Sequence, residues 1–233
     1  MHSKNQFKSV VLLSAGLDSS VNLYQAHAQT KVVLALTVNY GQRAAAKEIQ
    51  KAAALCANLG IAHKVLDLSF FKDFGRSSLI QTDEDIPKNS DVVMDDYQVS
   101  LQTAKSVWVP NRNGILLNIA AGFAESLNAH YVIPGFNKEE ATTFPDNSQQ
   151  FLEKLTESLS FSTGNQVQVQ CYTTDLVKTE IVKLGQTLHV PWKELWPCYQ
   201  AFELWCGECE SCQRSRRAFV QAGVDTQGFY LKG

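Results

Sequence analysis

The sequence lacks a long apolar run and a strong excess of either charge. No stretch approaches the roughly 20 apolar residues that a membrane-spanning helix needs. Lys and Arg total 21 and Asp and Glu total 23, so the formal net charge of -2 favours neither nucleic acid nor an anionic membrane as a partner. The first residues also lack the apolar region and the small-residue cleavage site of a signal peptide. These absences predict a cytoplasmic protein without a direct membrane or nucleic-acid partner.

Cysteine is scarce outside one short stretch. Of the 6 cysteines, Cys56 and Cys171 stand alone, and the others lie close together near the C-terminus. That distribution does not suggest a disulfide scaffold. With 233 residues, 45% of them hydrophobic, the chain can bury a core as one globular domain with a small appendage.

Short runs of β-branched and aliphatic residues alternate with segments of helical periodicity. We expect strands at residues 8–13, 31–38, 62–68, 131–134 and 167–171. We expect helices at residues 18–29, 44–59, 115–127, 148–159 and 178–188, with Gly60 as the C-cap glycine of the second. Alternating strands and helices imply parallel pairing with right-handed crossovers. The predicted fold class is therefore α/β, with an open, mostly parallel five-stranded sheet and helices on both faces.

Residues 70–108 interrupt this alternation. The segment is polar and acidic and shows no clear periodicity. Its acidic residues include Asp83, Glu84, Asp85, Asp91, Asp95 and Asp96. A stretch of this length without periodicity predicts a lid, a binding loop or a disordered insertion.

The turn between the first strand and the first helix reads Ser-Ala-Gly-Leu-Asp-Ser-Ser at residues 14–20. It follows the carboxyl end of a parallel strand, where α/β proteins bind ligands. Free backbone N–H groups, the helix dipole and serine hydroxyls favour a bound phosphate, and Asp18 can hold Mg²⁺ or orient its water. The pattern is neither a Walker loop nor GxGxxG. An ordinary βα turn capped by Asp18 or a serine is the alternative interpretation.

Four cysteines near the C-terminus have the spacing of metal ligands. Cys206, Cys209 and Cys212 follow Cys198 and repeat the CxxC pattern. This pattern lets two thiolates bind one ion across a tight turn, which Gly207 eases. Four sulfurs fill a tetrahedral shell and leave no open position, which predicts one structural zinc ion. An iron–sulfur cluster and four unpaired core thiols are the alternatives.

Several motifs resemble those of a known family. The turn at residues 14–20 resembles the SGGxDS loop of the PP-loop pyrophosphatases, which split ATP into AMP and pyrophosphate, with Ala15 in place of a glycine. Further motifs resemble, in the same order, those of the 7-cyano-7-deazaguanine synthases (QueC family). They are Tyr40-Gly41-Gln42-Arg43, Val109-Pro110-Asn111-Arg112-Asn113, Phe144-Pro145-Asp146, Lys178-Thr179-Glu180 and the tail at residues 196–215. Asn39, Ala44, Asn111 and Asn147 depart from the family pattern, and the resemblance spans residues 8–220.

The resemblance implies an architecture and a reaction. It implies a PP-loop, adenine-nucleotide-hydrolase-like domain at residues 1–190, with residues 70–108 as a variable lid or insertion, and a zinc-binding tail at residues 191–233. The implied activity is an AMP-forming, ATP-dependent ligase. In it, 7-carboxy-7-deazaguanine is adenylated, free ammonia gives the amide, and a second ATP yields the nitrile preQ0 of queuosine biosynthesis. The implied cofactors are ATP, Mg²⁺ and one structural Zn²⁺ per chain, in a homodimer.

Candidate site residues follow from the motifs and from side-chain chemistry. For ATP binding they are Leu13, Ser14, Ala15, Gly16, Leu17, Asp18, Ser19, Ser20, Tyr40, Gly41, Gln42 and Arg43. For catalysis they are Asp18, Ser19, Arg112 and Lys178, because Lys and Arg neutralise pyrophosphate or hold a carboxylate. For the acceptor they are Arg112, Asn113, Gly135, Glu139, Glu140, Phe144, Pro145 and Asp146, because the N–H edge of a deazaguanine needs hydrogen-bond acceptors. The carboxylates Glu139, Glu140 and Asp146 would supply them, and Tyr40 or Phe136 would stack on the ring.

Several interpretations stay open at this point. Lys178 is alternatively a surface lysine, and Arg112 alternatively forms a helix-start salt bridge. A tolerated Cβ at Ala15 requires a negative φ, which we expect, so Ala15→Gly would leave activity intact. The aromatic residues Trp192, Trp196, Phe202 and Trp205 form either a dimer patch or core packing.

Three other functions also remain possible on the sequence alone. One is a PP-loop enzyme that modifies a tRNA base, with Arg214, Arg216 and Arg217 on phosphate. Another is an enzyme that activates a different carboxylate. The third is a non-catalytic nucleotide-binding module with a zinc staple.

Overall fold

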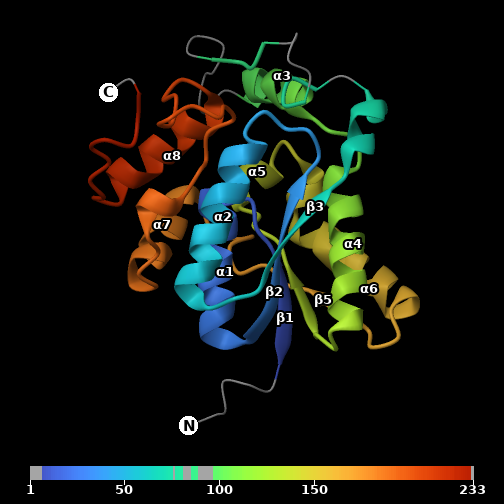
Figure 1. Cartoon of the computed structure of the whole chain (residues 1–233). Helices are drawn as coiled ribbons and strands as arrows, with labels where there is room; N and C mark the ends of the chain where they lie inside the picture. Colours follow the sequence, from blue (N-terminus) through green and yellow to red (C-terminus); the bar gives the residue numbers. More distant parts are fainter. Residues whose placement is uncertain (1–6, 76, 81–84, 89–96, 232–233) are drawn as a thin grey trace.

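The computed structural model describes residues 7–75, 77–80, 85–88 and 97–231. Its centre is a five-stranded sheet in the order β3-β2-β1-β4-β5, and every pair of neighbours is parallel (Figure 1). The strands are β1 (Lys8–Leu12), β2 (Lys31–Asn39), β3 (His63–Asp67), β4 (Tyr131–Ile133) and β5 (Gln168–Val169). The predicted α/β class is confirmed. The chain moves outward from β1 to β3 and then returns to the other side of β1, so the connections diverge between β1 and β4.

The helices connect and cover these strands. They are α1 (Leu17–Gln29), α2 (Ala45–Leu59), α3 (Tyr97–Val107), α4 (Arg112–Ser126), α5 (Lys138–Ala141), α6 (Gln149–Ser162), α7 (Lys178–Thr187) and α8 (Glu210–Gln221). Short 3₁₀ turns are η1 (Ser69–Phe74), η3 (Pro145–Asn147) and η4 (Trp192–Glu194). Gly60 ends α2 with φ +64, as expected of a C-cap glycine. Among the described residues, no helix is both long and apolar enough to span a bilayer.

Alternating strand residues build a core on each face of the sheet. Val11 and Ile133 point to the face covered by α1, α2 and α7, whereas Val10 and Val132 point to the face covered by α4 and α6 (Figure 1). All four side chains are fully buried. This two-sided burial explains why the strand sequences are continuous apolar runs, as parallel sheets require.

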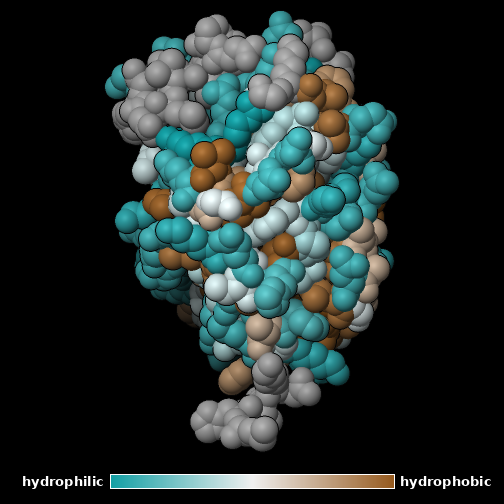
Figure 2. Space-filling model, turned by 90° about the vertical axis from the view of Figure 1, so that its left-hand side faces the viewer, coloured by the Kyte–Doolittle hydropathy of each residue, from teal (hydrophilic) through white to brown (hydrophobic). Residues whose placement is uncertain are grey.

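The C-terminal tail shares the core of the main body. Helix α8 packs on α7, and Trp196, Trp205 and Phe219 belong to the same apolar cluster as Val11. Trp196 and Trp205 are each 4% exposed, so core packing explains these two residues. Trp192 is partly buried against the same cluster, whereas Phe202 is 47% exposed, so a dimer contact at Phe202 stays a prediction. The face on the α7 and α8 side is largely hydrophilic, with hydrophobic residues in scattered patches (Figure 2). The division of the chain at residue 190 stays a prediction.

Three of the described helices were not predicted, and one of them is the single turn α5. Helix α3 lies inside the segment 70–108, and α8 lies inside the cysteine-rich tail (Figure 1). Of the acidic residues noted in that segment, Asp85 is described, while Asp83, Glu84, Asp91, Asp95 and Asp96 lie outside the described residues. The lid role of residues 70–108 therefore stays a prediction.

Candidate active site

A cavity of about 280 Å³ opens at the carboxyl ends of β1, β2 and β4. This is the point where the connections diverge, the usual ligand site of an open α/β sheet. Its walls come from the turns after these strands, from the first residues of α4 and α7, and from the tail. Its lining residues include Ser14, Gly16, Asp18, Ser19, Tyr40, Gln42, Glu48, Arg112, Asn113, Gly135, Phe136, Glu140, Phe144, Lys178, Tyr199, Glu210, Ser211, Arg214 and Ser215.

The turn after β1 presents an open helix N-terminus to this cavity. Helix α1 begins at Leu17, and its N-cap Gly16 makes no side-chain hydrogen bond, so neither Asp18 nor a serine caps it. The Ser14 and Ser19 hydroxyls lie 3.1 Å apart, and Ser14 N–H donates to Ser19 Oγ over 3.3 Å. The first N–H groups of a helix have no partner within the helix, and its dipole favours negative charge. The turn is therefore built to receive an anion such as phosphate.

Ala15 does not have the backbone conformation expected from the sequence. Its φ is +60, whereas the Cβ at this position led us to expect a negative value. The left-handed conformation costs an L-residue about 1–2 kcal/mol, and glycine avoids that cost. Ala15 is fully buried, and its carbonyl accepts a 2.7 Å hydrogen bond from Trp196 N–H of the tail. The expectation about φ was wrong because this tail contact could not be foreseen locally.

Gly135 lets the loop after β4 lie against the start of α1. A Cβ at this position would lie 2.4 Å from both the backbone N and the Cα of Ser19. Such a contact is far inside van der Waals distance, and both atoms belong to backbone. Gly135 therefore lines the cavity by permitting close approach of two backbone segments.

Asp18, Lys178 and Glu140 form a buried charge cluster at the cavity wall. Lys178 Nζ lies 2.9 Å from Asp18 Oδ2 and 2.9 Å from Glu140 Oε1. Asn137 donates a further 2.9 Å hydrogen bond to Asp18 Oδ2, while Asp18 Oδ1 has no partner among the described residues. Burial opposes the charge on Lys178, but the two carboxylates outweigh it and raise the pKa of this ammonium. Lys178 is thus not the surface lysine of the alternative interpretation.

The same cluster perturbs both carboxyl groups. Burial raises the pKa of Asp18 despite the opposing effect of Lys178. Burial acts in the same direction on Glu140, but there the Lys178 ammonium prevails and lowers the pKa. Two carboxylates and one ammonium leave the cluster short of one positive charge, so a bound cation would complete it.

Arg112 is the first residue of α4 and contacts Tyr40 in the cavity wall. Its Nη1 donates a 3.3 Å hydrogen bond to the Tyr40 hydroxyl, and its guanidinium carbon lies 5.8 Å from the ring centroid. The N-cap Asn111 has φ +50, where the family motif has glycine. Asn113 Nδ2 is buried without a partner in the described part of the chain. No carboxylate of the described residues lies within 4.0 Å of the Arg112 guanidinium, so the alternative interpretation of Arg112 as part of a helix-start ion pair is not supported.

Several sequence-predicted residues do not line the cavity. They are Ala15, Ser20, Gly41, Arg43, Glu139, Pro145 and Asp146. Burial raises the pKa of the Asp146 carboxyl, and the charge of Arg112 opposes that rise. Glu139 faces the tail and not the cavity. Its Oε1 accepts the Lys178 N–H at 2.8 Å, and its Oε2 lies 3.2 Å from Arg217 and 3.6 Å from Arg214.

The cavity also contains side chains that sequence reasoning missed. Glu48 reaches it from α2, and Tyr199, Glu210, Ser211 and Ser215 reach it from the tail. Arg214, which the sequence suggested only as a contact for tRNA phosphate, lies beside them. Glu210 and Arg214 are paired, with Nε and Nη2 of the arginine 2.9 and 2.7 Å from one carboxylate oxygen. The sequence did contain a signal for the residues of α8. A helical period over residues 210–221 would place positions 211, 214 and 215 on one face of a helix.

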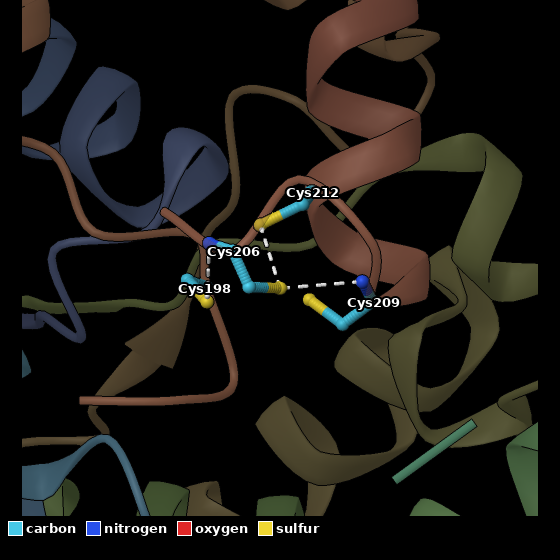
Figure 3. A group of neighbouring side chains, drawn as sticks. All are labelled: Cys198, Cys206, Cys209 and Cys212. Carbon is cyan, nitrogen blue, oxygen red and sulfur yellow. Dashed lines mark hydrogen bonds between the residues drawn. The ribbon is translucent and has the colours of Figure 1, made fainter. Parts of the chain in front are cut away.

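The four C-terminal cysteines converge on one point (Figure 3). Their sulfurs lie within 4.8 Å of one another, and all four residues are buried. Cys206 Sγ and Cys212 Sγ are 3.8 Å apart, the spacing of about 3.8 Å expected for two thiolates on one tetrahedral zinc. Backbone N–H groups of Cys206 and Cys209 point to Cys198 Sγ and Cys206 Sγ at 3.3 Å each. Such N–H contacts stabilise thiolates, so the donor set fits a zinc ion.

The parallel sheet, the open turn at its switch point and the four-cysteine element define an α/β protein with a candidate anion site and a candidate metal site. The family model described as "Queuosine biosynthesis protein QueC" matches residues 8–223, and the chain belongs to this family. A 7-cyano-7-deazaguanine synthase from Bdellovibrio bacteriovorus is 58% identical over 97% of this chain and 99% of that protein. Synthases of the same name from Desulforamulus reducens and Methanosarcina mazei are 48% and 41% identical, over 96% and 93% of this chain and 98% and 95% of theirs.

Proposed function

We propose that this chain makes 7-cyano-7-deazaguanine from 7-carboxy-7-deazaguanine and ammonia, as an AMP-forming, ATP-dependent ligase of queuosine biosynthesis. The observation that carries the proposal is the buried Asp18–Lys178 pair beside an open helix N-terminus, inside a cavity at the switch point of the sheet. Curated relatives that match almost the whole chain bear the corresponding name.

The turn at residues 14–20 would hold the phosphates of ATP. Ser14 and Ser19 hydroxyls and the free N–H groups at the start of α1 supply donors, and Lys178 supplies positive charge. Asp18 Oδ1 is a buried carboxylate oxygen without a partner in the described chain, which fits a ligand of Mg²⁺. When bound, that ion would neutralise phosphate charge and replace the positive charge that the cluster lacks.

No protein nucleophile is needed for the reaction. An oxygen of the acceptor carboxylate bonds to the α-phosphorus of ATP, and pyrophosphate leaves. Ammonia then attacks the carboxyl carbon, loses a proton, and AMP departs with that oxygen. The amide oxygen attacks a second ATP in the same way, and loss of AMP and the remaining N–H protons leaves the nitrile. Lys178 and Arg112 would orient the carboxylate and neutralise developing phosphate charge, so positioning and electrostatics supply the rate.

The metal at the four cysteines would be structural. Four sulfurs leave no open coordination position, and the cluster lies in the tail that fixes α8 against α7. Through α8, one zinc ion per chain would hold Arg214 and Ser215 in the cavity wall. We further propose a cytoplasmic homodimer without direct nucleic-acid contact, which light scattering and salt-dependent tRNA binding would test.

One incubation tests the proposed function. Purified protein is supplied with ATP, Mg²⁺, ammonium and 7-carboxy-7-deazaguanine, and the product is analysed by mass. The nitrile and acceptor-dependent pyrophosphate are expected. Pyrophosphate release with another carboxylate or with tRNA, but not with this acceptor, would assign a different substrate. Absence of pyrophosphate with every acceptor would indicate a non-catalytic nucleotide-binding module.

A further inference from the structure

Among the described residues, four carboxylates line the cavity, and three of them are paired with a cation. Asp18 and Glu140 share Lys178, and Glu210 pairs with Arg214 at 2.7 Å. The fourth is Glu48 of α2, which no motif assigned to the site. Within the described chain, Glu48 has no Lys, Arg or His partner within 4.0 Å.

Gln42 holds the Glu48 carboxylate in place. Gln42 Nε2 donates to Glu48 Oε2 and to the Val38 carbonyl, each over 2.9 Å. Gln42 Oε1 accepts the Tyr40 N–H, also at 2.9 Å. The glutamine is thus fixed by the backbone after β2 and fixes the carboxylate in turn. A carboxylate can accept about four hydrogen bonds, so this one contact leaves most of its capacity available.

The environment of Glu48 makes its charge costly without a ligand. Burial raises the pKa of Glu48 to about 7, although the hydrogen bond from Gln42 and the charge of Arg112 oppose that rise. Arg112 and the Tyr40 hydroxyl are the titratable groups that act on it. The lysines of its own helix, Lys47 and Lys51, are paired with Glu203 and Glu194. A ligand that donates hydrogen bonds to this carboxylate would therefore stabilise its ionised form.

We propose that Glu48 recognises the acceptor, by accepting hydrogen bonds from the adjacent ring N–H and amino group of its guanine-like edge. The inference rests on the proposed function and names the group that selects its substrate. Two neighbouring donors match the two oxygens of a carboxylate. The adenine edge of ATP has an amino donor beside a ring nitrogen with a lone pair, which would face a carboxylate oxygen unfavourably. Glu48 thereby takes the role expected of Glu139 and Asp146, which do not line the cavity.

The first test separates the acceptor from ATP by kinetics. Glu48→Gln replaces one acceptor oxygen by a donor of similar size, and we expect the acceptor KM to rise about 10- to 100-fold. The KM of ATP should stay within twofold. Gln50→Ala, at an exposed position of the same helix, is the control and should change neither constant. An unchanged acceptor KM, or an equal or larger effect on ATP, overturns the inference.

The second test needs no variant. Binding of 7-deazaguanine, which has the donor edge but no carboxylate, is measured by calorimetry on the wild-type protein at pH 8 and pH 6. Because only ionised Glu48 accepts both hydrogen bonds, protonation below about pH 7 competes with binding. The affinity for 7-deazaguanine should fall about tenfold from pH 8 to pH 6, whereas the affinity for ATP should not show this fall. Equal affinity at both pH values rejects the role of Glu48. A wild-type protein that makes no nitrile instead rejects the proposed function.

Discussion

Lys178 Nζ lies 2.9 Å from Asp18 Oδ2, across 160 positions of the chain. The first residue of α7 thereby meets the first turn of α1 beside the cavity. The two side chains are only 5% and 12% exposed, so this pair is buried and not a screened surface contact. The contact places an ammonium where the phosphates of a nucleotide would arrive at the helix N-terminus.

Lys178→Met is expected to abolish most activity and to destabilise the fold. The substitution leaves Asp18 and Glu140 buried without their common cation, which should lower the free energy of unfolding by about 3 kcal/mol or more. Loss of a charge that stabilises departing pyrophosphate should lower kcat about 100- to 1000-fold. Urea unfolding and pyrophosphate release measure the two effects. Lys183→Met, at an exposed position of the same helix, is the control and should match wild type. Turnover of the Lys178 variant within twofold of wild type would exclude a role for this ammonium.

Gly135→Ala is expected to disrupt ATP binding. The added Cβ would lie 2.4 Å from the Ser19 backbone, so the loop after β4 or the turn of α1 must move. We expect ATP affinity to fall at least tenfold, because displacement of a positioned binding group by about 1 Å is costly. Gly122→Ala is the control, since a Cβ there would meet no atom beyond its own stretch of helix within 4 Å, and alanine favours the helix. Equal ATP affinity of the two variants would contradict the close approach.

Removal of the metal is expected to lower stability. Purified protein should be colourless and hold one zinc per chain, and a chelator should lower Tm by about 10 °C. Cys206→Ser should lose the metal, because its sulfur lies 3.8 Å from Cys212 Sγ within the cluster. Cys56→Ala, at a buried thiol outside the cluster, should keep a full equivalent of zinc. A brown protein that contains iron would refute the zinc assignment.

Glu139→Gln is expected to affect catalysis through Lys178 and not through acceptor binding. Glu139 Oε1 accepts the backbone N–H of Lys178, and Oε2 faces Arg217 and Arg214 of α8. Through these contacts, the Glu139 carboxylate connects the start of α7 to α8 in the tail. Its loss should lower kcat several-fold and the unfolding free energy by about 1 kcal/mol, with the acceptor KM unchanged. A large rise in acceptor KM would instead return Glu139 to the substrate-binding role. Glu157→Gln, exposed on α6, is the control.

Local patterns predicted most of the fold. The apolar runs at β1 and β2 and the glycine that ends α2 act within a few residues, so the sequence displays them directly. Helix α8 was missed because metal-ligand spacing dominated the interpretation of its sequence. Helix α3 was missed because it lies within a segment whose overall composition is polar.

The sequence predicted the part of the site that a single motif forms. It did not predict the parts that form where distant segments of the chain meet. The turn at residues 14–20 was found, but the φ of Ala15 depends on a hydrogen bond from Trp196. Glu48 belongs to none of the motifs recognised in the sequence. Its position in the cavity wall becomes evident only when the fold brings α2 close to Arg112. Glu139 and Glu140 are adjacent in sequence, yet only Glu140 lines the cavity, because the two side chains of this short helix point to different neighbours.

The central claim is that the turn after β1 presents the α-phosphorus of ATP to an oxygen of the bound carboxylate. Turnover of acceptor labelled with ¹⁸O in both carboxylate oxygens tests it most directly, with AMP analysed by mass spectrometry. One oxygen leaves with AMP when the amide forms and the other when the nitrile forms, so each of the two AMP molecules per nitrile should carry one ¹⁸O, and pyrophosphate none. Unlabelled AMP, or label in inorganic phosphate beside ADP, would contradict attack at the α-phosphorus.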